Sequence, residues 1–212
     1  MPSQKIKSQR MTSGFTIIEV VLVLAIAGLI FLMVFVALPA LQRSQRDTAR
    51  RNDMSRVDTS LVQYQTNHSD QSNNLPSAGS WQGASTYPNN CTSNSACSFI
   101  RDYMNSGASG ENTTNTFDDP DGAPYSLIIT DNMKTKGNSF AGGSYSISGM
   151  NSKLEGDNAN GWTINTGNFS EHVIFIIPGA RCVDGKAKVS DTRHFAVMYR
   201  LEGAGVYCID DQ

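Results

Sequence analysis

An uncharged run of 22 residues constrains this chain more than any other feature of its sequence. No charged residue lies between Val20 and Leu41, and Glu19 stands directly before the run. A helix rises by about 1.5 Å per residue, so a run of this length can cross the roughly 30 Å hydrocarbon core of a bilayer. An ionisable side chain inside the bilayer costs about 2.5 kcal/mol or more. Glu19 therefore needs a partner or a function that offsets this cost.

A short basic leader precedes the apolar segment. It carries Lys5, Lys7 and Arg10 and no acidic residue. Positive charge keeps its flank of a membrane helix in the cytoplasm, so we expect the remainder of the chain to cross to the outside.

Two simpler interpretations of this N-terminal region stay open. A secretory signal peptide could be cleaved after the Ala-Ile-Ala segment at 25–27, but the product would keep the apolar residues 28–41 and Glu19 would have no role. A plain membrane anchor is the second interpretation, and it rests on the length of the span alone.

Gly14, Phe15, Thr16 and Glu19, followed by the apolar helix, resemble the leader junction of a type IV prepilin. The resemblance covers about the first 68 residues: the leader, the junction, an apolar half-helix and an amphipathic half-helix. It implies that a membrane prepilin peptidase cleaves between Gly14 and Phe15, that Phe15 is N-methylated, and that many such helices pack into a filament core.

The resemblance also implies a role for Glu19, which in the family meets the N-terminal amine of a neighbouring subunit. A carboxylate in apolar surroundings gains most from a cation, and cleavage exposes an amine at Phe15. Gly28 and Pro39 are candidate points of kinking or local unwinding when the helix leaves lipid. Pro39 lies about three residues later than the family pattern, so the position of that break stays open.

The expected fold class is α+β, the pilin fold, in which a long N-terminal helix packs on a C-terminal antiparallel β-sheet. We expect a cleaved leader at 1–14, a membrane and filament-core helix at 15–41, and an amphipathic continuation at 42–68. A variable loop at 69–124 then leads to the sheet, with a C-terminal cysteine loop, at 125–212.

The segment 42–58 is rich in arginine, with five Arg and three Asp. We interpret it as a solvated helix face on which Arg43 pairs with Asp47, and Asp47 with Arg51, at helical spacing. A DNA-binding stripe is a weaker alternative, because the acids interrupt it, and no specific nucleic-acid partner is expected. Its residues would be Arg43, Arg46 and Arg50, and the interrupting acids are Asp47, Asp53 and Asp58.

Helical spacing of 3 and 4 predicts that one face of the second half-helix lies against the sheet. The residues on that face are Met54, Val57, Leu61, Tyr64 and His68. Within the loop that follows, residues 98–104 are expected to form a helical turn or two, with Phe99, Tyr103 and Met104 turned inward.

The segment Asp-Asp-Pro-Asp-Gly-Ala-Pro-Tyr at 118–125 predicts a turn, because Pro presets φ and Gly accepts a positive φ. It is similar to a segment found before the first strand of pilins and secretion pseudopilins. Asp118, Asp119 and Asp121 are a weak calcium candidate, because no Glu follows at the EF-hand distance. We prefer the turn, and we expect no cofactor or metal.

Five short β-branched or aromatic segments predict strands. They are residues 125–130, 144–148, 173–177, 194–201 and 206–209. The Gly-Ala-Gly connector at 203–205 predicts that the last two pair as a hairpin.

All four cysteines follow the apolar run, so they are expected to face an oxidising exterior. Of the three possible pairings we favour Cys91 with Cys97 and Cys182 with Cys208. The histidines are scattered along the chain and no C-x-x-C spacing occurs, which argues against zinc.

These features predict a structural subunit of an extracellular type IV pilus used for adhesion, motility or DNA uptake. Its expected partners are identical subunits, the prepilin peptidase, the assembly platform and the cytoplasmic membrane, which holds the single-pass precursor. A pseudopilin of a type II secretion or competence system is the alternative. A membrane-anchored extracellular binding module or enzyme is the third interpretation, and the sequence contains no G-x-S-x-G, P-loop or H-E-x-x-H motif.

Overall fold

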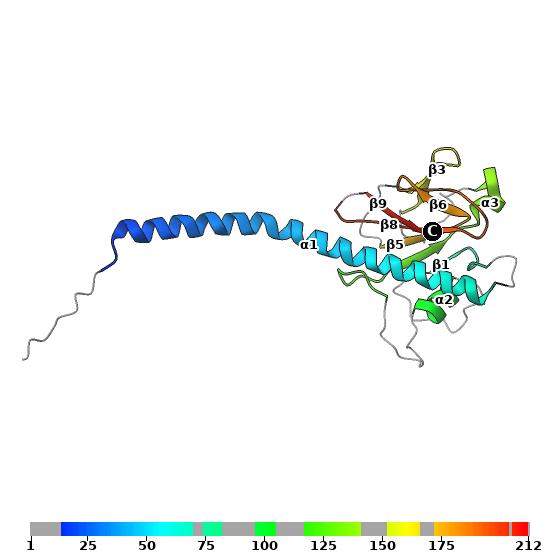
Figure 1. Cartoon of the computed structure of the whole chain (residues 1–212), viewed down its shortest axis with the longest axis horizontal. Coiled ribbons are helices and arrows are strands. Elements are labelled where there is room, and N and C mark those ends of the chain that lie inside the picture. Colours follow the sequence, from blue (N-terminus) through cyan, green and yellow to red (C-terminus); the bar gives the residue numbers. More distant parts are fainter. Residues whose placement is uncertain are drawn as a thin grey trace, which may run out of the picture. The chain divides into compact units, whose positions relative to one another are not determined.

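The computed structural model describes residues 14–69, 74–81, 96–104, 117–140, 152–165, 172–203 and 205–211. The chain forms two compact units, Met1–Gln42 and Arg43–Gln212, which are considered separately below. The helix α1, Ile17–Asn67, contributes its apolar half to the first unit and its amphipathic half to the second (Figure 1). The second unit contains both β-sheets.

A five-stranded sheet forms the centre of the second unit. Its strands run in the order β1, β2, β5, β8, β9. Their bounds are Gly79–Trp81, Ser126–Ile129, Val173–Pro178, Phe195–Arg200 and Val206–Asp210. The β2–β5 pair is parallel, and the other neighbours are antiparallel, so the sheet is mixed but mostly antiparallel.

A smaller antiparallel sheet adds four strands in the order β3, β4, β7, β6. They span Leu154–Asp157, Gly161–Ile164, Lys186–Val189 and Ala180–Val183. Short helical elements complete the described part of the chain: α2 (Ala96–Phe99), the π-helical turn η1 (Ile100–Met104), α3 (Met133–Lys136) and the 3₁₀ turn η2 (Gly137–Ser139).

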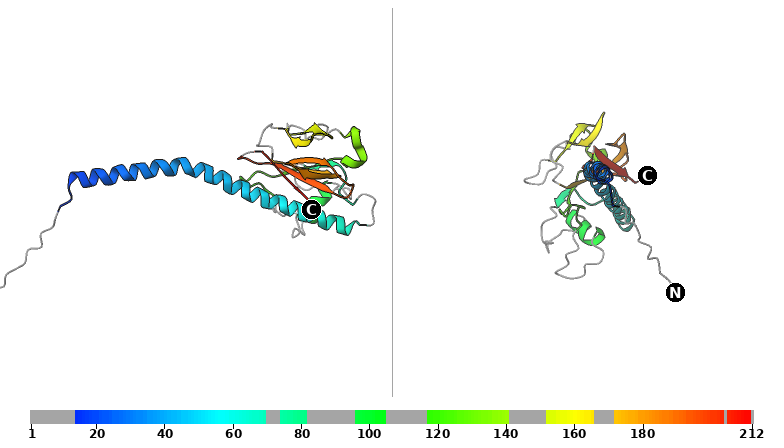
Figure 2. Two further views of the ribbon diagram at one scale, coloured as in Figure 1. Left: turned by 45° about the horizontal axis from the view of Figure 1, so that its top comes forward. Right: turned by 90° about the vertical axis from the view of Figure 1, so that its left-hand side faces the viewer.

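Both faces of the central sheet are buried, and successive residues of β5 alternate between two hydrophobic clusters. Ile174 and Ile176 belong to the cluster formed with α1, whereas Phe175 and Ile177 belong to the cluster formed with the smaller sheet. This alternation follows from the two-residue repeat of a strand. Within the second unit, α1 and the smaller sheet therefore cover opposite faces of the central sheet (Figure 2).

The α+β class is confirmed, and so is the predicted apolar face of α1. Met54, Val57, Leu61 and Tyr64 are all buried in the cluster that α1 shares with the central sheet. The other member of that predicted face, His68, stacks on the ring of Tyr64. Phe99 and Met104 are buried as expected, and Tyr103 is partly buried against the same cluster.

The pairing of Cys182 with Cys208 is confirmed, and it links β6 of the smaller sheet to β9 of the central sheet. The predicted hairpin of β8 and β9 is also confirmed. The pairing of Cys91 with Cys97 and the strand expected at 144–148 lie outside the described residues.

The expectation of a single antiparallel sheet was incomplete. The central sheet has five strands and contains a parallel pair, β2 with β5, and the second sheet was not expected. Parallel neighbours need a long connection, so no turn signal near either strand indicates that they pair.

A core truncation tests this layer arrangement. We expect Leu61→Ala to lower the free energy of unfolding by about 2–5 kcal/mol, because Leu61 is fully buried between α1 and the sheet. The matched control is Val62→Ala, one residue further on, where the side chain is 42% exposed and the change should stay within about 0.5 kcal/mol. Urea unfolding of the full chain in detergent measures both, and equal losses in the two variants would contradict the assignment.

Candidate functional site

The apolar half of α1 is exposed along its whole length in the part of the chain that the structure describes. Every residue from 14 to 45 is exposed except Ala27, and Phe15 and Ile17 are more than four-fifths exposed. By length and composition α1 can span a membrane, and a signal sequence near the N-terminus would pass the same test. An uncharged helix that is apolar on all sides requires lipid or protein around it.

Glu19 lies in the first turn of α1. The helix begins at Ile17, and the backbone N–H groups of Glu19 and Val20 both donate to the carbonyl of Thr16, at 3.2 and 3.4 Å. Thr16 and Glu19 have the spacing of a capping box, and a carboxylate in the first turn interacts favourably with the helix dipole. Glu19 therefore has a local role available within its own chain, besides any pairing with a neighbour.

The fold of the single chain does not require the glycines of the N-terminal region. A Cβ atom at Gly14 or Gly28 would meet nothing within 4 Å, and neither residue has a positive φ. A need for Gly14 would thus have to come from a protein that acts on the chain. Gly28 and Pro39 both lie inside the continuous α1, so the unwinding expected there in another state stays a prediction.

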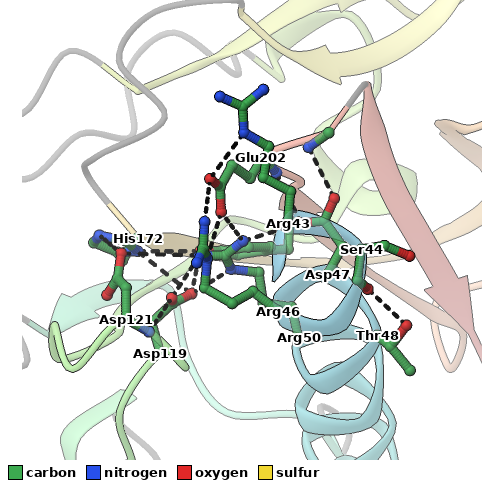
Figure 3. A network of polar contacts seen from close by, with 12 residues as sticks. Arg43, Ser44, Arg46, Asp47, Thr48, Arg50, Asp119, Asp121, His172 and Glu202 are labelled. Carbon is green, nitrogen blue, oxygen red and sulfur yellow. Dashed lines mark hydrogen bonds and ion pairs between the residues drawn. The ribbon is translucent and has the colours of Figure 1, made fainter. Parts of the chain in front are cut away.

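Among the described residues of the second unit, an extensive polar cluster is centred on Arg50, whose side chain is 0% exposed (Figure 3). Its Nε and Nη2 atoms donate to the two carboxylate oxygens of Asp119, each at 2.7 Å. Nη1 donates to Asp47 at 3.0 Å and to Glu202 at 3.1 Å. Such a bidentate pair matches the planar guanidinium to the carboxylate, and it offsets the cost of removing both charges from water.

The turn at 118–125 presents Asp119 to Arg50. The N–H of Asp119 donates to the carbonyl of Ala123 at 2.7 Å, and the N–H of Gly122 donates to the carbonyl of Asp119 at 2.8 Å. Gly122 has φ +92°, a conformation that favours glycine. The predicted turn is therefore present, and its function within the fold is to fix one carboxylate.

Asp119 is held ionised. Burial alone would raise the pKa of Asp119, but hydrogen bonds from His172, Arg50, the backbone of Asp121 and Tyr199 outweigh burial and lower that pKa well below its usual range. Burial likewise opposes the charge on Arg50, and its bonds to Asp119 and Glu202 more than compensate, so the pKa of Arg50 is raised.

Glu202 and Asp47 connect the β8–β9 turn to α1. Arg46 donates to both oxygens of Glu202, at 2.8 and 2.6 Å, and this bonding lowers the pKa of Glu202 to about 2. Asp47 accepts the backbone N–H groups of Glu202 and Gly203 at 2.9 and 2.8 Å. A Cβ atom at Gly203 would lie 2.8 Å from a carboxylate oxygen of Asp47, so the close approach requires glycine there.

His172 closes the network on the side of β5. Its Nδ1 lies 3.3 Å from the hydroxyl of Tyr199 and 3.4 Å from Asp119, and its Nε2 lies 3.3 Å from Asp121. The ligand atoms of Asp119, Asp121 and His172 lie within 4.8 Å of one another, close enough for a metal ion. Both oxygens of Asp119 are already bonded to Arg50, however, so an incoming cation would have to compete with a buried guanidinium.

The structure therefore groups different residues than the calcium site suggested by the sequence. Asp119 and Asp121 come together with His172, and among the described residues Asp118 is not part of that group. A backbone bridge instead pairs Asp118 with Pro124 across the turn.

The interpretation of residues 42–58 as a solvated charged face was wrong in its details. Asp47 is buried and pairs with Arg50 rather than with Arg43 or Arg51 across the surface. The three acids that interrupt the arginines face the domain: Asp53 accepts the hydroxyl of Tyr125, and Asp58 lies near the C-terminal strand. Because Arg50 has no exposed side-chain surface, a DNA-binding stripe that includes it does not form.

A sequence signal for the buried Arg50 was available. Arg50 precedes Met54 by four residues, which places it in phase with the apolar face of α1. An arginine on the apolar face of a helix must either extend its guanidinium to solvent or pair it with an acid inside the core. The partner Asp119 lies 69 residues away in the chain, so no local spacing could identify it.

The comparisons with known proteins do not extend these observations. No protein-family model matches the chain. No curated protein matches it, and no solved structure matches it. The functional argument therefore rests on the sequence and on the geometry described above.

Removing the buried cation tests the network. We expect Arg50→Met to destabilise the folded unit by about 3–5 kcal/mol, because Asp119 would keep its charge in a buried place without its main partner. The control is Arg51→Met. The exposed guanidinium of Arg51 lies 5.8 Å from the ring centre of Tyr207, so its removal should cost only the cation–π interaction, about 0.5–1 kcal/mol. Thermal unfolding of the full chain in detergent separates the two, and equal shifts would contradict a structural role for the Asp119 pair.

Proposed function

We propose that this chain is a structural subunit of an extracellular type IV filament. In this proposal it is held in the cytoplasmic membrane as a precursor and polymerises through the apolar half of α1 after cleavage between Gly14 and Phe15. The observation that carries the proposal is the exposed apolar surface of α1 from Phe15 to Leu41. The unit from Arg43 onward, in contrast, buries its apolar residues in two hydrophobic clusters of its own.

The exposed surface sets the energetic requirement. Each large apolar side chain gains about 1.5–3 kcal/mol on full burial, and the segment exposes many of them on all sides of the helix. Lipid can satisfy this requirement for a monomer, and identical helices can satisfy it in a filament. A plain anchor accounts for the first environment only.

Glu19 supplies the specificity in this proposal. Cleavage by a prepilin peptidase would expose an amine at Phe15, four residues before Glu19, and N-methylation would leave that amine cationic. Pairing between the carboxylate of one subunit and the amine of its neighbour would neutralise both charges in apolar surroundings and fix the register of the helices. The further partners are the assembly platform and identical subunits, and the filament would serve adhesion, motility or DNA uptake.

A pseudopilin of a secretion or competence system is the second candidate. The observation that favours it is the turn at 118–125, similar in sequence to a segment of pilins and secretion pseudopilins, which here locks Asp119 onto the buried Arg50. Both candidates use the same helix chemistry. Electron microscopy of cells that make the chain separates them, because a pilin yields long surface filaments and a pseudopilin does not.

Cleavage is the first step to test. Mass spectrometry of the chain recovered from its native cells should give a polypeptide that begins at Phe15 and carries one added methyl group. Gly14→Val should leave the uncleaved precursor in the membrane, because a side chain at this position affects the peptidase and meets nothing in the chain itself. Gly28→Ala, an equally open position, should be processed normally. A native product that begins at Met1 or Gly28 would end the proposal.

The charge of Glu19 is tested separately from its position in the helix. A capping box accepts Gln as well as Glu, so Glu19→Gln keeps the helix start and removes only the charge. We expect processing to continue in both Glu19→Gln and Glu19→Ala and sheared filaments to be lost in both, as seen by immunoblotting of the sheared fraction. Normal filaments in Glu19→Gln would show that charge pairing does not align the subunits.

A further inference from the structure

Three carboxylates are found where β9 packs on α1, since Tyr207 and Ile209 of β9 lie against the hydrophobic cluster of the helix. Asp58 lies on α1, Asp210 is the last residue of β9, and Asp211 follows it. The Oδ1 atom of Asp58 is inaccessible to solvent and has no hydrogen-bond partner among the described residues. Among the described residues, the side chain of Asp58 takes no part in the Arg50 network.

The two C-terminal carboxylates are fixed in place by other contacts. Asp210 accepts the backbone N–H of Cys182 at 2.8 Å, beside the disulfide to Cys208. Asp211 accepts the backbone N–H of Phe195 at 3.1 Å, and its other oxygen lies 3.1 Å from Nδ1 of His194. Neither carboxylate can move away from Asp58 without breaking these bonds.

The cations in this region are engaged elsewhere. His194 contacts Asp211, and Nη2 of Arg181 lies 3.0 Å from Nε2 of His194. On α1 itself, Arg51 lies over the ring of Tyr207 of β9. The residues three and four positions from Asp58 on α1 are uncharged: Met54, Ser55, Leu61 and Val62. The charges that act on Asp58 are therefore those of Asp211 and Asp210, which have the same sign as its own.

The physical consequence is a carboxyl group that keeps its proton to a higher pH than an ordinary aspartate does. Burial raises the pKa of Asp58, and the charges of Asp211 and Asp210 raise it further, to about 6. In the unfolded chain the same group has an ordinary pKa of about 3.9. The folded state thus binds more protons than the unfolded state between these two values.

We propose that Asp58 is a proton-operated latch between α1 and the C-terminal strand. When the side chain is protonated, the helix packs against the end of β9 without repulsion between like charges. When it is ionised, the same contact is weakened. The latch depends only on the folded unit from Arg43 onward, so it holds whether or not the chain polymerises.

The sign of the effect follows from linkage. A carboxyl group with a raised pKa in the folded state contributes stability that is complete below its unfolded pKa and is lost as the pH rises through about 6. The folded-to-unfolded ratio should rise about threefold to tenfold when the pH is lowered from 7.5 to 5.0. Below about pH 4.5 Asp119 and Glu202, whose pKa values are lowered, act in the opposite direction.

The test is urea unfolding of the full chain in detergent at pH 7.5 and 5.0. We expect Asp58→Asn to lose most of the rise in stability that the wild type shows on acidification. Asp184→Asn is the matched control, because Asp184 is exposed in the β6–β7 turn, and it should keep the wild-type dependence. An identical pH dependence in Asp58→Asn and the wild type would overturn the proposal.

A second measurement decides the matter if Asp58→Asn does not fold. The carboxyl carbon of Asp58 in the wild-type chain, followed by NMR, should titrate with a midpoint near 6. A midpoint near 4 would show that the side chain is ordinarily ionised, and the latch would be excluded.

Discussion

The pairing of Arg50 with Asp119 is the interaction on which the arrangement of the folded unit depends. A guanidinium without solvent contact is tolerable only when its donors are satisfied, and here two carboxylate oxygens take two of them at 2.7 Å each. Asp47 and Glu202 both accept from the remaining nitrogen, Nη1. The same carboxylate of Asp119 also receives the hydroxyl of Tyr199 from β8. One buried charge thus ties a helix, a turn, a central strand and a hairpin to one another.

The parts of the fold that could be predicted from the sequence are those with a local repeat. The 22-residue apolar run, the apolar face of α1 and the turn at 118–125 each carry their own signal within a short window. The β8–β9 hairpin was found for the same reason. The β6–β7 hairpin was missed although its signal was present. Asp184 and Gly185 form its turn, with φ +52° and +71°, and residues 186–189 alternate between polar and apolar side chains.

The rest required contacts between distant segments. The parallel pairing of β2 with β5 has no signal in the sequence of either strand. The inward direction of Asp47, Asp53 and Asp58 could not be separated from a solvated face by charge spacing alone, since both arrangements place opposite charges three or four residues apart. At the candidate site, sequence reasoning named Glu19 and the junction, but it treated Arg50 as one of several surface arginines. Its phase with Met54 was the available clue.

The disulfide between Cys182 and Cys208 has a consequence for the durability of the folded unit. In the described sheet β9 is an edge strand, hydrogen-bonded to a neighbour strand on one side only. Such strands are normally the first to fray, and a frayed end is where proteases gain access. The covalent link joins this strand to the other sheet, so β9 can separate only if β6 moves with it. A strand at the edge of the sheet is thereby among the hardest to separate from the fold.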